Sequence, residues 1–418
     1  MDRLTNTVKP YAWGSTTAIP GLLGTPPTGE PQAELWMGAH PGAPSSLDRG
    51  KGAQSLPDVI AADPEGELGP GSVRAFGPRL PFLLKLLAAA SPLSLQVHPD
   101  LGQAAEGFAE EEARGVPLES PERNYKDPFH KPELICALTP FDGLCGFRTA
   151  EEAAGLLAGL DVDGLKPYVD VLRAGPASEA LREVLTAVLT ADRDATARTV
   201  AEAARAAEAL SLRSGSPYAP AYGVYASLAH HYPGDPGVIA AMLLNHVRLQ
   251  PGEALYLGAG VPHAYLEGLG VEIMANSDNV LRCGLTPKHV DVPELLRIVR
   301  FEPGEPGILR PEAGPDGEER YDVPAGEFRL SRYVFARGGV PGRLGAAAPQ
   351  ILLCTAGSVV LRGEGGTGGT GTGPGTGTPA GGGAGELTLR QGQSAYVRAG
   401  ERLTAGGEGT LFRATVAV

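Results

Sequence analysis

The chain has 418 residues and a formal net charge of −13; hydrophobic residues make up 42% of it and charged residues 20%. This length predicts two or three domains, and the composition is that of a globular protein. We find no run of about 18 apolar residues and no apolar stretch in residues 1–10, so we expect neither a membrane span nor a secretory signal. The acidic balance argues against nucleic-acid binding but allows an anionic substrate in a local basic pocket.

The cysteines give an expectation about location. All four, at positions 136, 145, 283 and 354, lie far apart and form no CxxC pair. In a chain of this size, scattered cysteines indicate reduced thiols and not a disulfide framework. We therefore expect a cytoplasmic protein.

The first part of the chain, residues 1–148, is mixed and rich in turns. The sequence holds 59 Gly and 38 Pro, and short segments between such residues predict β-architecture with tight turns. After Asn245 the turn-rich β pattern returns, with apolar and polar residues alternating around PGEALYL.

Residues 149–235 have a helical character. Charges interrupt Ala and Leu at helical spacing in Glu151–Leu160, Ser178–Leu189 and Ala195–Leu212. The sequence HYPG at 231–234 is typical of a helix stop followed by a turn. We predict a helical insert over this range.

The tail from about Phe328 again predicts four or five short alternating strands joined by Gly turns. Gly363–Glu386, dominated by Gly and Thr, interrupts two strands that should pair. Its composition cannot bury a core, so we expect a disordered hairpin loop.

Two short segments place polar residues two positions apart. LSLQVHPD contains Gln96 and His98 in a predicted strand, where residues two apart share a face. HKPELICAL presents Lys131 and Glu133 in an extended segment, because Pro132 disfavours the helical region for the residue before it.

The segment GVPHAYLEG repeats this spacing with His263 and Tyr265. Side chains from three such segments could converge in the mouth of a β-barrel. Two imidazoles, a carboxylate and an amide oxygen suit Zn²⁺, and the set is Gln96, His98, Glu133 and His263. With a single carboxylate such a site keeps a net positive charge, which would stabilise an oxyanion. The alternative is a set of unrelated polar residues, because no compact motif such as HExxH occurs.

Basic and aromatic residues elsewhere are candidates for substrate binding. Arg282 and Lys288, in NSDNVLRCGLTPKHVD, could bind a phosphate or an oxyanion, or be solvated charges of a structural loop. Lys85 is a lone charge in PFLLKLLAA, so we expect it to reach a site or an ion pair; the alternative is a lysine that extends to water from an element edge. Trp13 is either a core residue or a lid over the cleft.

The sequence resembles the type I mannose-6-phosphate isomerases, also called phosphomannose isomerases, in six segments that occur in the family's order. These are YAWGS, AELWMGAHPGAPS, PFLLKLL, PLSLQVHPD, YKDPFHKPELICALTPFDGLCGFR and GAGVPHAYLEGLGVEIMANSDNVLRCGLTPKHVDV. The resemblance runs from Tyr11 to about Val292, and the tail resembles the family's terminal β-domain. The chain departs from the family in the Gly/Thr segment and in a rather short helical insert, neither of which touches a matched site.

The resemblance implies a mainly β fold of cupin (jelly-roll) β-barrels with an inserted α-helical domain. Residues 1–148 plus 236–327 would form the catalytic zinc cupin domain, 149–235 the helical insert, and 328–418 a cupin-like β-domain containing the disordered loop 363–386. One Zn²⁺ per chain is implied, held by Gln96, His98, Glu133 and His263. Arg282 is implied as an active-site residue, and the pocket is lined by Lys131, Tyr265 and Glu272.

The implied reaction interconverts mannose 6-phosphate and fructose 6-phosphate through a cis-enediol(ate), with Lys131 or Glu272 as the base. The predicted substrate contacts are Lys85, Ser94, Tyr265, Lys288 and Trp13. Two alternatives remain open: another metal-dependent cupin enzyme, such as an Fe²⁺ oxygenase with a two-His-one-carboxylate site, and a non-catalytic sugar-phosphate sensor. We expect a monomer or weak homo-oligomer that binds neither nucleic acid nor membrane.

Overall fold

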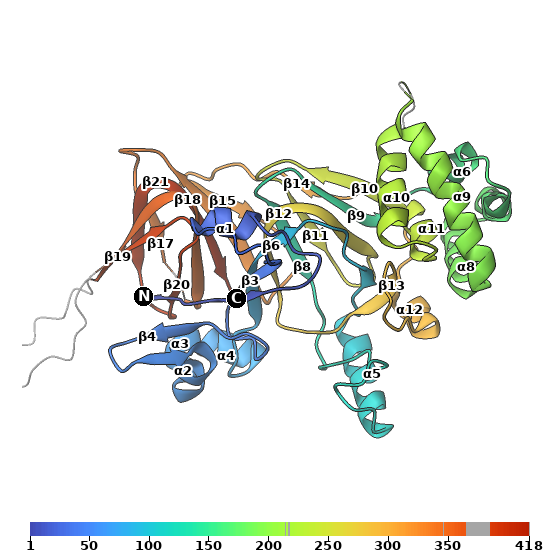
Figure 1. The fold of residues 1–418 in the computed structure, drawn as a ribbon. Helices are drawn as coiled ribbons and strands as arrows, with labels where there is room; N and C mark the ends of the chain where they lie inside the picture. The colour runs from blue at the N-terminus through green and yellow to red at the C-terminus, as the bar shows by residue number, and fades with distance from the viewer. Residues whose placement is uncertain (214, 216–217, 346, 365–384, 418) are drawn as a thin grey trace, which may run out of the picture. The chain divides into compact units, whose positions relative to one another are not determined.

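The structure is a computed structural model that describes residues 1–213, 215, 218–345, 347–364 and 385–417 (Figure 1). The chain folds into two compact units. Unit 1 comprises Met1–Pro10, Thr16–Leu86 and Arg310–Val418, and unit 2 comprises Tyr11–Ser15 and Leu87–Leu309. Both units contain β-sheet, and most of the helices belong to unit 2. The fold therefore consists mostly of β-sheets accompanied by helices.

Unit 1 contains a β-sheet built largely from the tail of the chain. Its strands are β1 (Asp2–Arg3), β15 (Glu318–Tyr321), β16 (Arg329–Phe335), β17 (Gly342–Leu344), β18 (Gln350–Gly363), β19 (Glu386–Arg390), β20 (Ser394–Val397) and β21 (Leu403–Thr415). The long strand β18 pairs with β20 through its first residues, with β19 through its last, and with β21 along its whole length. The predicted pairing of the strands on either side of the Gly/Thr segment is confirmed. Most of the predicted loop itself, 365–384, lies outside the described residues.

The N-terminal part of unit 1 adds short elements. These are β2 (Thr7–Lys9), α1 (Ala18–Leu23), β3 (Glu34–Met37), β4 (Ser46–Asp48), β5 (Ala53–Ser55), α2 (Leu56–Ala62), α3 (Pro64–Leu68) and α4 (Pro70–Phe76). Arg49, which follows β4, forms ion pairs of 2.8 Å to Asp2 of β1 and 2.6 Å to Glu67 of α3. Strand β6 (Phe82–Ala89), buried along its whole length, begins in unit 1 and ends in unit 2.

The other strands of unit 2 carry the candidate site residues. They are β7 (Leu95–Val97), β8 (Glu133–Ala137), β9 (Phe141–Phe147), β10 (Leu244–Leu249), β11 (Ala254–Leu257), β12 (His263–Ala275), β13 (Leu281–Gly284) and β14 (Ile308–Leu309). Strand β12 is central: its first residues pair with β9 and β7, and its last residues pair with β8. A long strand that changes partners brings segments distant in sequence to one surface.

The two faces of these strands pack into different apolar clusters. On β12, Ala264 and Leu266 contact the cluster formed with the helices, whereas Tyr265 between them belongs to a cluster with Ile135 and Cys145. This alternation is the period-2 pattern of a strand covered on both faces. The face that carries Tyr265 is therefore turned away from the helices.

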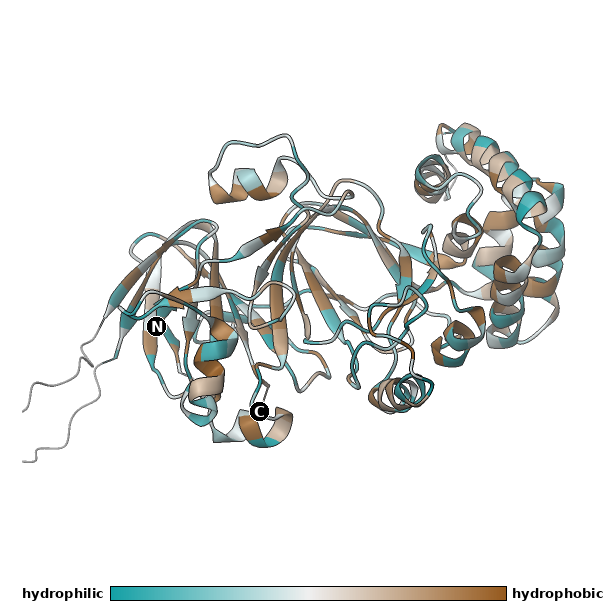
Figure 2. Ribbon diagram, turned by 60° about the horizontal axis from the view of Figure 1, so that its bottom comes forward, coloured by the Kyte–Doolittle hydropathy of each residue, from teal (hydrophilic) through white to brown (hydrophobic). Residues whose placement is uncertain are grey.

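The helices of unit 2 lie mainly in the predicted range. They are α5 (Leu101–Ala113), α6 (Ala150–Gly159), η1 (Asp163–Leu165), α7 (Lys166–Ala174), α8 (Ala177–Thr190), α9 (Arg193–Ser211), α10 (Ala219–His231), α11 (Gly237–Met242) and α12 (Val292–Ile298). The three predicted helices correspond to α6, α8 and α9, and α10 ends at His231, as HYPG predicts. Helices α6 and α8 to α11 group together in Figure 1, and Figure 2 shows hydrophobic and hydrophilic residues interspersed along them.

Capping residues explain where several of these helices begin. Thr149 and Glu152 form a capping box at the start of α6, and Asp100 and Gln103 form another at the start of α5. In the part of the chain that the structure describes, no helix is both long and apolar enough to cross a membrane. The predicted three-part domain division stays a prediction.

Candidate metal centre

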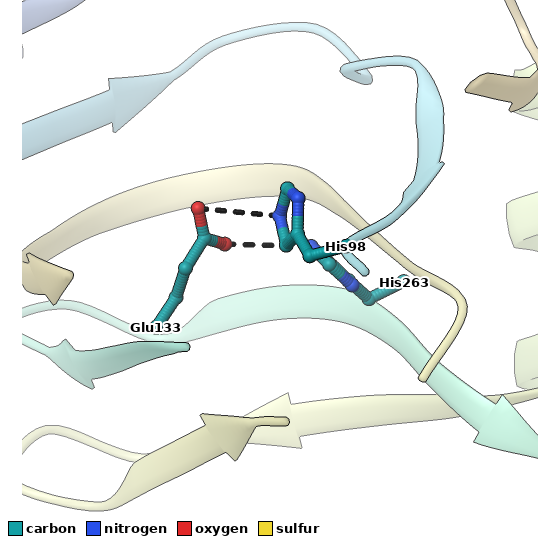
Figure 3. Close-up of side chains that lie close together, drawn as sticks. All are labelled: His98, Glu133 and His263. Carbon is teal, nitrogen blue, oxygen red and sulfur yellow. Dashed lines mark ion pairs between the residues drawn. The ribbon is translucent and has the colours of Figure 1, made fainter. Parts of the chain in front are cut away.

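Three side chains from distant segments converge inside unit 2. The possible ligand atoms of His98, Glu133 and His263 all lie within 4.8 Å of one another, and the three residues are buried. The Glu133 carboxylate points at both rings (Figure 3): Oε1 is 3.3 Å from His98 Nε2, and Oε2 is 3.4 Å from His263 Nε2. The spacing pattern of the sequence nominated all three residues.

Strand ends position these ligands. His98 directly follows β7, whereas Glu133 and His263 are the first residues of β8 and β12. Prolines adjoin all three at positions 99, 132 and 262. Because proline lacks an N–H and restricts the residue before it, each ligand lies where regular strand pairing starts or stops.

Hydrogen bonds fix how the two imidazoles present their nitrogens. His98 Nδ1 is 2.8 Å from the Asn279 carbonyl oxygen, and His263 Nδ1 is 2.9 Å from that of Val261. A carbonyl only accepts, so each Nδ1 carries the proton and each Nε2 lone pair points inward. In the described structure both Nε2 atoms and Glu133 Oε2 are buried without a hydrogen-bond partner. Orphaned buried ligand atoms of this kind fit a divalent cation.

The local electrostatics favour the ligand forms of these groups. Burial lowers the pKa of His98 to about 4, so its imidazole is neutral. Burial alone would raise the pKa of Glu133, but the positive charge of Lys131 holds it well below its usual value. Neutral imidazoles and an ionised carboxylate are the protonation states that bind a metal.

Gln96 lies on the same face as this triad. It pairs with His263 on one side, through β12, and with Arg282 on the other, through β13. Directly opposed residues share a sheet face. The half-buried Gln96 is thereby a neighbour of a triad histidine.

Lys131 and Glu272 also face the centre. Lys131 Nζ lies 3.1 Å from Glu133 Oε1. Glu272 is buried on β12 opposite Ile135 of β8, and Met274 opposes Glu133, so Glu272 and Glu133 share a face. Of the two candidate bases, Lys131 therefore contacts the triad, and Glu272 lies on the triad's face of the sheet.

Tyr265 is buried on the same face. Burial raises the pKa of Tyr265 well above its usual value, and the nearby Glu272 carboxylate raises it further. The phenol is therefore a neutral group that can donate a hydrogen bond.

Arg282 and Lys288 form a pair of like charges. Arg282 is the main cause that lowers the pKa of Lys288, while burial lowers the pKa of Arg282 itself. Among the described residues, neither side chain has an acidic partner. Two neighbouring cations without a counter-ion suit an anionic ligand.

Asp235, at the end of the helix-rich stretch, holds the loop between these cations. Its Oδ1 accepts the N–H groups of Gly237 at 2.6 Å and Leu285 at 3.0 Å, and its Oδ2 accepts that of Thr286 at 3.1 Å. The backbones approach closely, since a Cβ on Gly237 would lie 2.3 Å from the Leu285 nitrogen. Leu285 itself has a φ of 55°, which a non-glycine residue rarely adopts.

The remaining predicted substrate contacts are Trp13, Ser94 and Lys85. Trp13 is half-buried against the apolar cluster of Tyr265 and stacks on Tyr11, with ring centroids 5.7 Å apart. Ser94 is half-buried just before β7. Lys85 belongs to unit 1, where its Nζ lies 3.6 Å from Glu34 and 5.1 Å from the Trp36 ring centroid. An ion pair for Lys85 was one of the two roles expected of it.

Sequence reasoning missed three supporting residues: Asn279, Asp127 and Asp235. Asn279 lies in the polar stretch 276–291, in which the sequence nominated only the basic residues Arg282 and Lys288. The sequence signal for Asn279 was the polar tripeptide SDN directly beside long apolar strands. Such a position predicts burial, and a buried polar side chain requires hydrogen-bond partners.

Comparison with known proteins agrees with this geometry. A family model described as "Phosphomannose isomerase type I, catalytic domain" matches residues 1–150. The chain is 39% identical over 417 residues to the mannose-6-phosphate isomerases of Salmonella typhimurium and Escherichia coli, with 99% of each chain covered. It is 34% identical over 388 residues to that of Macaca fascicularis, covering 84% of this chain and 86% of the relative.

Solved structures agree as well. A variant of phosphomannose isomerase from Salmonella typhimurium matches with a TM-score of 0.88 and 37% identity over 100% of both chains. A mannose 6-phosphate isomerase bound with zinc and yttrium matches with a TM-score of 0.87, at the same identity and coverage. The chain therefore belongs to the mannose-6-phosphate isomerase family.

Proposed function

We propose that this protein is an aldose–ketose isomerase that interconverts mannose 6-phosphate and fructose 6-phosphate. The observation that carries the proposal is the buried His98–Glu133–His263 cluster, whose ligand atoms lie within 4.8 Å of one another. It belongs to a chain that matches named isomerases along their full length. The reaction moves a proton between C1 and C2 of the open-chain sugar through a cis-enediol(ate).

We propose one Zn²⁺ per chain, held by His98, Glu133 and His263 with Gln96 as the fourth ligand. Two histidines, a carboxylate and an amide oxygen form an acceptable zinc set, and a solved relative is described as bound with zinc. When bound, zinc would supply positive charge that polarises substrate oxygens and favours the enediolate.

Arg282 and Lys288 supply the other positive charges. Arg282 presents paired planar donors that match the two adjacent oxygens of a cis-enediolate. Lys288 is exposed and lies near enough to Arg282 for its pKa to be lowered, so we assign it to the phosphate. Ser94, Trp13 and Tyr265 are proposed substrate contacts in unit 2, and the phosphate contact of Lys85 stays a prediction.

Proton transfer between C1 and C2 is assigned to Lys131, which lies 3.1 Å from Glu133 Oε1, or to Glu272, which shares a sheet face with Glu133. Isomerisation in deuterium oxide separates them. The variant that lacks the base, Lys131→Met or Glu272→Gln, no longer exchanges the migrating hydrogen with solvent. The other variant continues to exchange it at a reduced rate.

The wider assignments rest on the family. We propose that the strands around the metal centre form a cupin barrel, that residues 149–235 are an inserted helical domain, and that 328–418 form a second cupin-like domain. We also propose a cytoplasmic monomer or weak homo-oligomer.

A coupled assay on mannose 6-phosphate tests the function. Zinc-loaded protein should turn the substrate over, chelation should abolish turnover, and added Zn²⁺ should restore it. Binding of the sugar phosphate without turnover by zinc-loaded protein would contradict the isomerase and indicate a sensor. Full activity after complete metal removal would contradict the metal's role.

A further inference from the structure

We propose that Asn279 is a positioning residue that assembles the metal centre, because it joins His98 to the chain segment that leads into Glu133. The inference rests on the proposed function only in requiring that the triad binds zinc. Asn279 does not touch the reacting atoms.

The side chain of Asn279 uses its whole hydrogen-bonding capacity on one neighbouring segment. It is fully buried. Its Nδ2 donates to the carbonyls of Asp127 at 2.7 Å and Phe129 at 2.8 Å. Its Oδ1 accepts the N–H groups of Lys126 at 2.7 Å and Asp127 at 3.2 Å. An amide offers two donors and two acceptor lone pairs, so residues 126–129 are fixed to Asn279 on both edges of its side chain.

The backbone of Asn279 fixes the other half of the centre. Its carbonyl oxygen lies 2.8 Å from His98 Nδ1, and this contact sets which nitrogen of His98 is protonated. Its N–H donates to Ser277 Oγ at 3.2 Å, and that hydroxyl donates to Asp127 Oδ1 at 2.8 Å. The Asp127 carboxylate also accepts the N–H of Asp278 at 2.9 Å.

These contacts link two ligands that the chain supplies separately. His98 follows β7, whereas Glu133 opens β8 a few residues after the segment that Asn279 holds. Glu133 itself is paired in the sheet, with Leu257 of β11 and Met274 of β12, whereas residues 126–129, which Asn279 holds, belong to no strand. Removing the side-chain amide should therefore let the segment that carries Lys131 into β8 shift against His98. The Asn279 backbone, whose carbonyl orients the His98 ring, should also become free to shift.

The test separates ligand positioning from general stability. Partners that orient a metal ligand typically contribute ~10- to 100-fold to metal affinity, so Asn279→Ala should weaken Zn²⁺ binding by about that factor in competition with a chromogenic chelator. Asn279→Asp should weaken it at least as much, because a carboxylate oxygen would face the carbonyls of Asp127 and Phe129.

Asn245→Ala is the matched control. Asn245 Nδ2 donates to the backbone carbonyls of Phe147 at 3.1 Å and Gly304 at 2.8 Å, and to those of Cys145 and Gly146 at 3.3 Å each. In the described structure, none of these carbonyls bonds the ring of a triad histidine. Its loss should lower the melting temperature comparably and leave zinc affinity within about threefold of the native protein.

Wild-type-like zinc affinity in folded Asn279→Ala, or an equal loss in Asn245→Ala, would overturn the proposal. If Asn279→Ala does not fold, Ser277→Ala serves instead, since it removes the hydroxyl between Asn279 and Asp127; unchanged zinc affinity in that variant would equally overturn it. Failure of the native protein to bind zinc would instead refute the proposed metal site.

Discussion

Tyr265 and Glu272 interact although seven positions separate them on one strand, β12. The Glu272 carboxylate contributes to the raised pKa of the Tyr265 phenol. On a regular strand, residues an odd number of positions apart point to opposite faces. A register shift between Tyr265 and Glu267, opposite Gly143 and Asp142, inserts one extra residue and brings Glu272 to the face of Tyr265.

Glu272→Gln should lower kcat by ~10²- to 10⁴-fold if Glu272 is the base, the usual contribution of a positioned general base. Zinc content should stay at the native level, because Glu272 is not among the proposed ligands. Glu267→Gln is the control on the same strand; Glu267 is exposed, so its kcat should not change. An equal fall in kcat for Glu267→Gln and Glu272→Gln would contradict the assignment of Glu272 to the face of the metal centre.

Loss of a triad ligand should remove the metal. His98→Ala, His263→Ala and Glu133→Ala are each expected to lose zinc and nearly all turnover, because each leaves the remaining buried ligand atoms without the geometry or charge to hold the ion. Gln96→Ala should be milder, since water can replace a neutral oxygen. Metal content by mass spectrometry checks this, and stoichiometric zinc in a His98→Ala/His263→Ala double variant would refute the assignment.

Arg282→Lys keeps a positive charge but loses the paired planar donors. If Arg282 stabilises the enediolate, kcat should fall ~10²-fold or more, the scale for losing one oxyanion donor, and KM should change much less. A phosphate contact would behave in the opposite way, with a large rise in KM and nearly unchanged kcat. Steady-state kinetics with verified zinc content decide between the two roles.

Asp235→Ala should loosen the loop that follows Arg282. Three backbone N–H groups lose their acceptor, and at ~0.5–1.5 kcal/mol per hydrogen bond the free energy of unfolding should fall by about 2–4 kcal/mol. KM should rise as Lys288 loses its fixed position. Asp194→Ala, on the exposed first turn of α9, should change stability by less than about 1 kcal/mol and leave KM unaltered.

Three of the four cysteines, Cys145, Cys283 and Cys354, should be unreactive in the folded protein at pH 8. Burial raises the pKa of Cys145 and of Cys283 to about 12 and that of Cys354 to about 11. Since the thiolate is the reactive form, a thiol-reactive chromophore should label these three only after denaturation.

The same shifts predict alkaline destabilisation. Unfolded thiols ionise near pH 8.5, whereas the native ones stay neutral. Their contribution to stability is therefore fully present below about pH 8.5 and is lost as the pH rises toward 11–12. Urea midpoints that rise over this range would contradict the prediction.

Much of the site could be predicted from the sequence, because its residues occur in short local patterns. Gln96 with His98, and Lys131 with Glu133, needed only the two-residue repeat of extended chain, and adjacent prolines limited those segments to that conformation. Helices α6, α8 and α9 were predicted by helical periodicity and helix-stop signals, and these too are properties of neighbouring residues.

Tertiary structure decided what depends on contacts between distant segments. The bulge that turns Glu272 inward depends on how β12 pairs with β9, a strand more than a hundred positions earlier in the chain. Asn279 and Asp235 matter through the backbone groups brought to them, and side-chain type alone does not distinguish a buried amide with four partners from one in water. The sequence by itself therefore identified the residues that can form the centre. The long-range hydrogen bonds that orient those residues exist only once the strands have paired.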